Sequence, residues 1–376
     1  MDFYNNDKFL SKLNKIISYD RAEKNDGMMD FDALEELYLN VLKSKRRLSK
    51  SRTSIVPLKR EKMISIALDF FKSIDEEFYE KAKNVLLNVD ERTNLEIVNV
   101  NNKNKQDMRG HVRTIKGKSE VYVPTQVELS KKTSLKDDMC TLKDLYTLVH
   151  EIAHLLDLNY KDSLPTNEDI LSKDLQEFKN KGTFTRELFA ESTAISFETL
   201  LMEYLMKKTN YPNIAILQEY IGGSNDLYDM TASLYGRLQL IKIQEQKNKI
   251  DYEDLSKLAK DNGVSSKYFQ HILRKIMNDN TSLTYRNRYV FAGAMYPTIV
   301  RKYHEEGSDG LKDYLAAVRE DEEDKALAVL GINMNNDGIK KVVVNIIRQD
   351  RYMLEMAIKN EQSVLESVKE DQRGER

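Results

Sequence analysis

The sequence has few residues that interrupt helices and few that cross-link a fold. Only 5 Pro and 14 Gly occur among 376 residues, so long helices can run unbroken and the chain is expected to be mainly α-helical. A single cysteine, Cys140, excludes a disulfide framework and favours a reducing compartment. The chain has only 5 His. Histidines that occur close together are therefore informative.

Long apolar runs and an excess of charge of one sign are also missing. No segment approaches the ~18 consecutive apolar residues of a transmembrane helix, and no secretory signal is visible at the N-terminus. We therefore expect a cytoplasmic protein that has no membrane partner. The formal net charge is -2. Basic clusters such as residues 43–47 are balanced by acidic runs elsewhere, so nucleic-acid binding is not expected.

The motif with the clearest chemistry is H-E-I-A-H at residues 150–154, within an apolar, helical stretch. Residues four apart lie on the same face of a helix, so His150 and His154 can bind one Zn²⁺. Glu151 then lies close to the metal and can act as a general base. The alternative is a pair of surface histidines or a satisfied core histidine. The apolar face of this stretch argues against it, because buried His and Glu are costly unless paired or metal-bound.

The chain divides into three expected regions. Residues 1–88 are predicted to form an N-terminal helical region, with helices near 5–18, 31–47 and 59–87. Residues 89–335 are predicted to form the catalytic region. Residues 336–376 are predicted to form a C-terminal helix that ends in a charged tail.

A small antiparallel β-sheet is expected directly before the zinc-binding helix. Residues 95–100 alternate like a strand, and residues 109–124 predict a β-hairpin that turns at 116–118. The strand at 119–123 could be an exposed edge that pairs with an extended peptide, or it could be purely structural. Thr141 and Asp144 form a T-x-x-D capping box, which predicts a zinc-binding helix over 141–158.

A catalytic zinc site needs a third protein ligand and one open position. The predicted helix over 183–208 carries Glu187, Glu191 and Glu198 at spacings of four and seven, which places them on one face. Small residues beside them would allow close approach to the zinc-binding helix. The alternative is a solvated acidic face on an amphipathic helix. Further helices are predicted at 213–222, 226–248, 252–261, 266–278, 284–305, 309–319 and 336–370.

Taken together, H-E-I-A-H at 150–154, F-A-E-S-T-A at 189–194 and Glu198 resemble the oligoendopeptidase F and thimet oligopeptidase family of gluzincin zinc metallopeptidases. The resemblance covers about residues 90–335. It implies a gluzincin-type zincin core with helical lobes on either side of a cleft, and one Zn²⁺ per chain. On the family's pattern Glu191 is the third ligand and Glu198 orients a ligating His. Glu187 lies outside the pattern and ranks lower.

The sequence also departs from the family. Asp157 stands where members often carry a His, and it could still accept a hydrogen bond behind the ligands. The helix over 284–305 resembles the family's Tyr-rich helix, but the His that usually precedes the catalytic Tyr is missing: His271 is the nearest upstream. The chain is also shorter than typical members, so it resembles a shortened member of the family.

The predicted activity is zinc-dependent hydrolysis of peptide bonds in oligopeptides. Glu151 would take a proton from the zinc-activated water and pass it to the leaving amine. A hydroxyl donor, predicted to be Tyr289 with Tyr285 behind it, would stabilise the oxyanion. Two alternatives stay open: a regulatory or toxin-like zinc protease with one protein target, and a catalytically idle zinc-binding module. The sequence does not reveal the oligomeric state.

Overall fold

The fold was analysed in a computed structural model of the whole chain. The structure describes residues 7–25, 31–44, 56–89, 93–99, 110–115, 118–125, 128–130, 133–134, 139–158, 182–261, 266–278, 281–319, 323–333 and 336–374.

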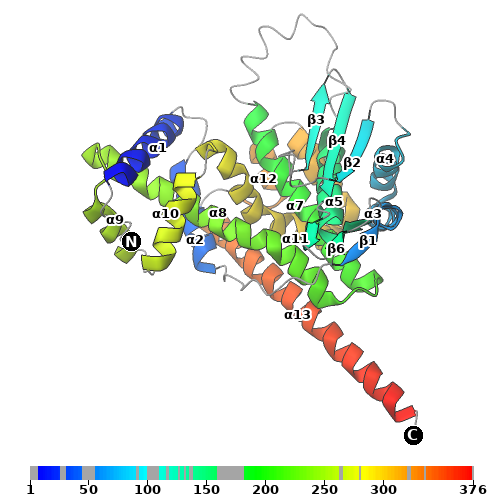
Figure 1. Cartoon of the computed structure of the whole chain (residues 1–376). Helices are drawn as coiled ribbons and strands as arrows, with labels where there is room; N and C mark the ends of the chain where they lie inside the picture. Colours follow the sequence, from blue (N-terminus) through cyan, green and yellow to red (C-terminus); the bar gives the residue numbers. More distant parts are fainter. Residues whose placement is uncertain are drawn as a thin grey trace, which may run out of the picture.

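Helices dominate the described residues, as the low Pro and Gly content predicts (Figure 1). The helices are α1 (Asp7–Asn25), α2 (Phe31–Ser44), α3 (Arg60–Ile74), α4 (Glu76–Leu86), α5 (Leu142–Leu158), α7 (Gly182–Lys208), α8 (Asn213–Lys247), α9 (Tyr252–Asp261), α10 (Ser266–Asn278), α11 (Leu283–Arg319), α12 (Glu323–Val329) and α13 (Asn336–Gly374). The predictions over 141–158, 183–208, 252–261 and 266–278 agree with these bounds to within one residue.

The predicted hairpin is present as β3 (His111–Ile115) and β4 (Lys118–Thr125). However, β2 (Thr93–Asn99) pairs with β4 in parallel, so the sheet is mixed and the prediction of an antiparallel sheet was wrong. The strand order β2-β4-β3 also places β4 in the centre. Residues 119–123 therefore have strands on both sides and cannot be the edge that receives a peptide. Within the described residues, the edge strand next to α5 is β3.

Short strands complete the β-structure. β1 (Pro57–Lys59) pairs antiparallel with β7 (Met139–Thr141), directly before α5, and β5 (Glu128–Ser130) pairs with β6 (Thr133–Ser134). The sequence analysis did not predict them, because segments this short carry too little alternation. Cys140 lies in β7 and is buried.

Three predicted helix boundaries were wrong. The first helix, predicted near 5–18, continues to Asn25. The segment 59–87 is two helices, because Asp75 has extended backbone angles and its side chain accepts a hydrogen bond from the Glu77 backbone N–H, which caps α4. Conversely, α8 is continuous through Gly222 and Gly223, where a break was predicted. In α11 the break expected near residue 307 is present as a kink, since Gly307 has a φ of 70°.

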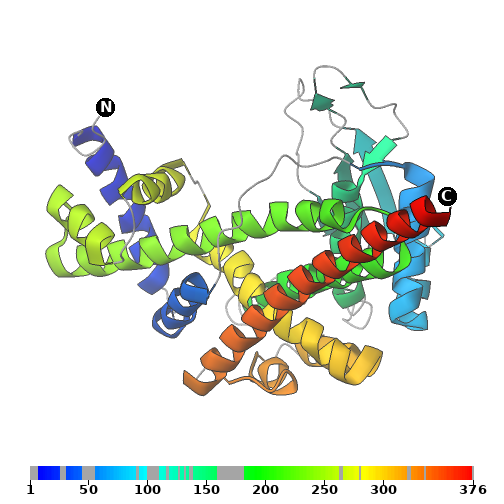
Figure 2. The same ribbon diagram turned by 90° about the horizontal axis from the view of Figure 1, so that it is seen from below.

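The metal-binding motif lies where the sheet meets the helical core. α5 packs against β3 and β4 on one side and against α7 on the other, and α7 packs along α11 (Figures 1 and 2). A single apolar cluster extends from Phe9 in α1 to Met353 in α13. None of the described helices combines the length and apolar character needed to cross a lipid bilayer.

Candidate metal centre

The position of α5 is fixed at its first turn by the predicted capping box. The Thr141 backbone N–H donates to Asp144 Oδ2 at 2.7 Å, and the Asp144 N–H donates to Thr141 Oγ1 at 3.2 Å. Both residues are buried. Six residues further on, His150 and His154 leave the same face of α5, and their rings lie 4.8 Å apart between centroids.

α7 presents Glu191 to these histidines because aromatic contacts anchor it on α11. The Phe189 ring packs edge-on against Phe291 at 5.5 Å and against Tyr314 at 6.3 Å. Thr193 donates to the Tyr314 hydroxyl at 3.3 Å. Glu191 lies between Phe189 and Thr193, so both of its flanks are held. The carboxylate of Glu191 thus lies within 4.0 Å of the Nε2 atoms of both histidines, whereas the contact of Glu198 is with Nδ1 of His150.

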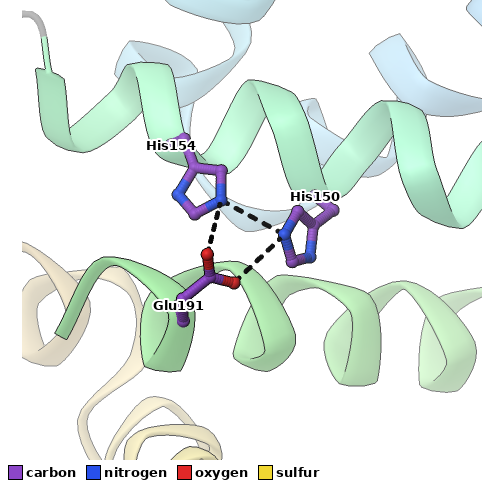
Figure 3. Close-up of side chains that lie close together, drawn as sticks. All are labelled: His150, His154 and Glu191. Atoms are coloured by element: carbon purple, nitrogen blue, oxygen red, sulfur yellow. Dashed lines mark hydrogen bonds and ion pairs between the residues drawn. The ribbon is translucent and has the colours of Figure 1, made fainter. Parts of the chain in front are cut away.

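Three ligand atoms converge on one point (Figure 3). His154 Nε2 lies 3.1 Å from His150 Nε2, His150 Nε2 lies 3.5 Å from Glu191 Oε2, and His154 Nε2 lies 4.0 Å from Glu191 Oε1. Among the described residues, these three form the group whose ligand atoms lie within 4.8 Å of one another. Their side chains are 18%, 15% and 15% exposed for His150, His154 and Glu191.

Glu198 lies behind His150 and orients it. His150 Nδ1 is 2.5 Å from Glu198 Oε1, one of the short hydrogen bonds typical of a charged acceptor. When Nδ1 donates to this carboxylate, the tautomer leaves the Nε2 lone pair directed at His154 and Glu191. The spacing of seven residues between Glu191 and Glu198, two turns of α7, brings the two acids to opposite nitrogens of one ring.

The charges of the cluster balance internally. Burial lowers the pKa of His150, but hydrogen bonds to Glu191 and Glu198 outweigh it and raise the pKa well above the usual value. Burial lowers the pKa of His154 to about 4, so this imidazole is neutral. Burial opposes ionisation of Glu191, yet His150, His154 and Arg288 together lower its pKa to about 2. His154 and Glu191 are therefore already in the protonation states that bind a cation, and only His150 must release a proton.

Glu151 lies on the side of α5 that faces β3. Its side chain is buried, and burial raises its pKa to about 7, with His150 lowering it and Glu191 and Glu198 raising it further. Gly110, directly before β3, leaves the space that the carboxyl fills: a Cβ there would lie 2.4 Å from Glu151 Oε1. A carboxylate whose pKa is near 7 suits general acid–base chemistry.

The two predicted tyrosines occupy successive turns of α11 and contact each other. The Tyr285 and Tyr289 hydroxyls lie 3.1 Å apart, and the Arg288 guanidinium lies over the Tyr285 ring at 5.7 Å. The charge of Arg288 acts on Glu191, so this part of α11 faces the cluster. Their role as oxyanion donors stays a prediction.

The other residues singled out in the sequence lie outside the candidate metal centre or outside the described residues. The side chains of Asp157 and Glu187 lie outside the part of the molecule that the structure describes. His271 faces Asp229, with Nε2 3.4 Å from Oδ2. Gly110, Arg288 and the anchoring role of Tyr314 were not predicted from the sequence. For Gly110 the usable signal was a glycine at the start of a strand next to the motif helix.

The donor set fits a zinc ion. Glu191 Oε2 is buried and has no hydrogen-bond partner beyond the long 3.5 Å contact with His150 Nε2, which is costly unless a cation fills the space between it and the imidazoles. Tetrahedral zinc with N and O ligands requires ligand atoms about 3.4 Å apart, close to the observed separations. Two imidazoles and one carboxylate are the donor set of catalytic rather than closed structural zinc sites.

Comparison with known proteins gives a fold and no family. No family model matches the chain, and no curated protein matches it. Two solved structures match it. A candidate peptidase from Chlamydophila abortus has a TM-score of 0.54 and 12% identity, and the match covers 92% of this chain and 55% of that chain. A candidate oligoendopeptidase F from Bacillus anthracis has a TM-score of 0.49 and 12% identity, and the match covers 94% of this chain and 57% of that chain. The chain thus spans about half the length of the structures that it matches. At this identity the likeness to the first structure shows a shared fold.

Proposed function

We propose that this protein is a zinc-dependent metalloendopeptidase of the gluzincin type, which hydrolyses peptide bonds in oligopeptides. The observation that carries the proposal is the convergence of His150, His154 and Glu191, with Glu151 buried beside them. The shared fold with a structure described as a candidate peptidase supports it. Zn²⁺ held by these three residues would supply a Lewis acid that polarises a peptide carbonyl and acidifies water.

The chain's own residues then have distinct roles. Glu151 accepts the proton of the attacking water and delivers it to the leaving amine, a role that suits a carboxyl buried beside the three proposed ligands. Glu198 holds His150 in the tautomer that presents Nε2. Tyr289, with Tyr285 hydrogen-bonded behind it, donates to the oxyanion. An extended substrate would lie along β3, the described edge strand nearest Glu151.

The test compares the wild type with Glu151→Gln. Metal analysis of both proteins is expected to give one zinc per chain, because Glu151 is not in the ligand set. Cleavage of a peptide library by the variant should fall by about 10²–10⁴-fold, the usual contribution of a general base. Glu305→Gln, at a carboxylate that is 55% exposed on α11, is the matched control and should cleave normally. Undiminished cleavage by Glu151→Gln would sink the mechanism.

A further inference from the structure

The long C-terminal helix α13 uses one face to join the core. Ile339, Val342, Ile346 and Met353 are buried and are spaced by three, four and seven residues. This face packs against α2, α8 and α11. The distal part of the helix extends beyond the rest of the molecule (Figure 1), so α13 is longer than its contact with the core requires.

A second apolar stripe runs along α13 on a different face. Val344, Ile347 and Leu354 are 43%, 45% and 55% exposed, and they make up half of the six large hydrophobic residues that are exposed in the described part of the chain. Arg351 is also exposed and lies on the same stripe. These positions follow the alternating three- and four-residue spacing of a coiled-coil seam.

The sequence continues this spacing to the end of the helix. The next seam positions are Ile358, Glu361, Leu365 and Val368. The seam from 344 to 368 therefore spans about 3.5 heptads, which is long enough to predict a coiled coil. It has eight positions, of which six are apolar and two are charged with opposite signs.

We propose that this seam pairs with the same seam of a second copy of the chain, as an antiparallel two-helix coiled coil. In the antiparallel register centred on residue 356, every seam residue has a matching partner. The pairs, each made twice, are Val344 with Val368, Ile347 with Leu365, Arg351 with Glu361, and Leu354 with Ile358. The two charged positions thus face each other, and each remaining pair is apolar.

The two charged seam residues favour antiparallel over parallel pairing of the helices. A parallel pair would place Arg351 against Arg351 and Glu361 against Glu361, and like charges at a seam oppose association. The antiparallel pair forms two Arg–Glu contacts that also fix the register. It is isologous, as a two-fold dimer requires. The partner helix approaches the face of α13 that the core leaves exposed, so the core contacts are retained.

The association of the full-length protein tests this inference without reference to its activity. Sedimentation velocity should show a dimer at micromolar concentration. Arg351→Glu and Glu361→Arg should each raise the dimer dissociation constant by about tenfold or more, because each places like charges together. The double variant R351E/E361R should restore the wild-type constant, since the opposite charges face each other again.

Lys359→Glu is the matched control. Lys359 lies between the seam positions Ile358 and Glu361 in the sequence, but helical spacing turns residue 359 away from the seam. Reversing its charge should therefore leave dimerisation unchanged. Circular dichroism of each variant checks that α13 stays helical. A monomer at ~100 μM, where even a weak specific dimer would form, would overturn the proposal. So would a dimer that the single variants leave intact, or one that the double variant fails to restore.

Discussion

On the proposed function, single residues around the candidate metal centre would contribute either to metal binding or to catalysis. Glu198 contacts His150 Nδ1 at 2.5 Å and belongs to the ligand support. Glu151 is the proposed general base, and its carboxyl occupies the space that a Cβ at Gly110 would fill. A substitution at Glu198 should therefore change the zinc dissociation constant, and a substitution at Gly110 should change the rate of peptide cleavage.

Glu198→Ala is expected to weaken zinc binding by about 10–100-fold, the usual effect of losing a carboxylate that orients a ligating His. The physical reason is that His150 loses both its orientation and the negative charge that makes Nε2 a better donor. Competition with a chromophoric chelator measures the zinc dissociation constant. Glu306→Ala, at a carboxylate that is 49% exposed on α11, should leave the constant unchanged. Equal constants for Glu198→Ala and wild type would refute the role of Glu198.

Gly110→Ala is expected to lower the rate of peptide cleavage by about tenfold or more while zinc binding stays intact. The new Cβ would lie 2.4 Å from Glu151 Oε1 and 2.7 Å from Thr147 Cγ2, so the Glu151 carboxyl must move. The control is Gly236→Ala in α8, where the nearest atom would be 3.4 Å away. Cleavage at the wild-type rate by Gly110→Ala would show that the position of Glu151 is not constrained from this side.

Contacts between candidate site residues could be predicted from the sequence only where the residues are close along the chain. His150, Glu151 and His154 occupy one and a half helical turns, so helix geometry alone brings them together. Glu191 came from a resemblance in its local motif. Gly110 and Arg288 act across elements that are 41 and 97 residues away from Glu151 and Glu191 respectively, and no local spacing encodes those contacts.

At the scale of elements, the presence of a helix or strand was easier to predict from the sequence than where it ends or which strand it pairs with. Residues 59–87 keep an apolar helical period across Ile74, so the break at Asp75 is visible only as a helix-capping residue. Gly222-Gly223 suggests a break, yet α8 continues because the part before the glycines packs on α5 and α7 and the part after them packs on α2 and α10. The parallel pairing of β2 with β4 depends on a connection whose path the strand sequences do not determine.

The packing of α1 on α8 predicts a pH-dependent stability. Asp20 in α1 lies 3.3 Å from Arg237 in α8, and both side chains are buried. Burial raises the pKa of Asp20 to about 6; the charge of Arg237 lowers it and that of Glu23 raises it. A raised pKa means that the folded state binds this proton more tightly than the unfolded state. The stability from this group is therefore present below pH ~4 and is lost as pH rises through 6.

Comparison with Asp20→Asn isolates that effect. Between pH 4 and pH 7 the wild type should lose about 2 kcal/mol relative to the variant, because Asn stays neutral throughout. Urea denaturation of both proteins at pH 4, 5, 6 and 7 gives the two free energies of unfolding. Parallel pH profiles would show that Asp20 has the same pKa in the folded and unfolded states.

At the scale of the whole molecule, the metal centre joins parts of the fold that lie far apart in the sequence. α5 carries two of the proposed ligands and packs on the sheet, while α7 carries the third and packs along α11. The proposed dimer seam lies on α13, away from this centre in sequence. Association and metal binding are therefore independent tests of two different regions.

Metal binding is expected to stabilise the entire fold, since it ties α5 to α7 in the folded state alone. Free zinc at 100 times its dissociation constant adds about 2.7 kcal/mol, so a chelator should lower the thermal midpoint of the wild type by several degrees. Glu191→Ala removes a ligand and should make the midpoint insensitive to chelator, whereas Glu151→Gln keeps all three ligands and should respond like the wild type. Differential scanning calorimetry of the three proteins separates loss of metal from loss of the base. A wild-type midpoint unaffected by both chelator and added zinc would show that the cluster does not hold the metal in solution.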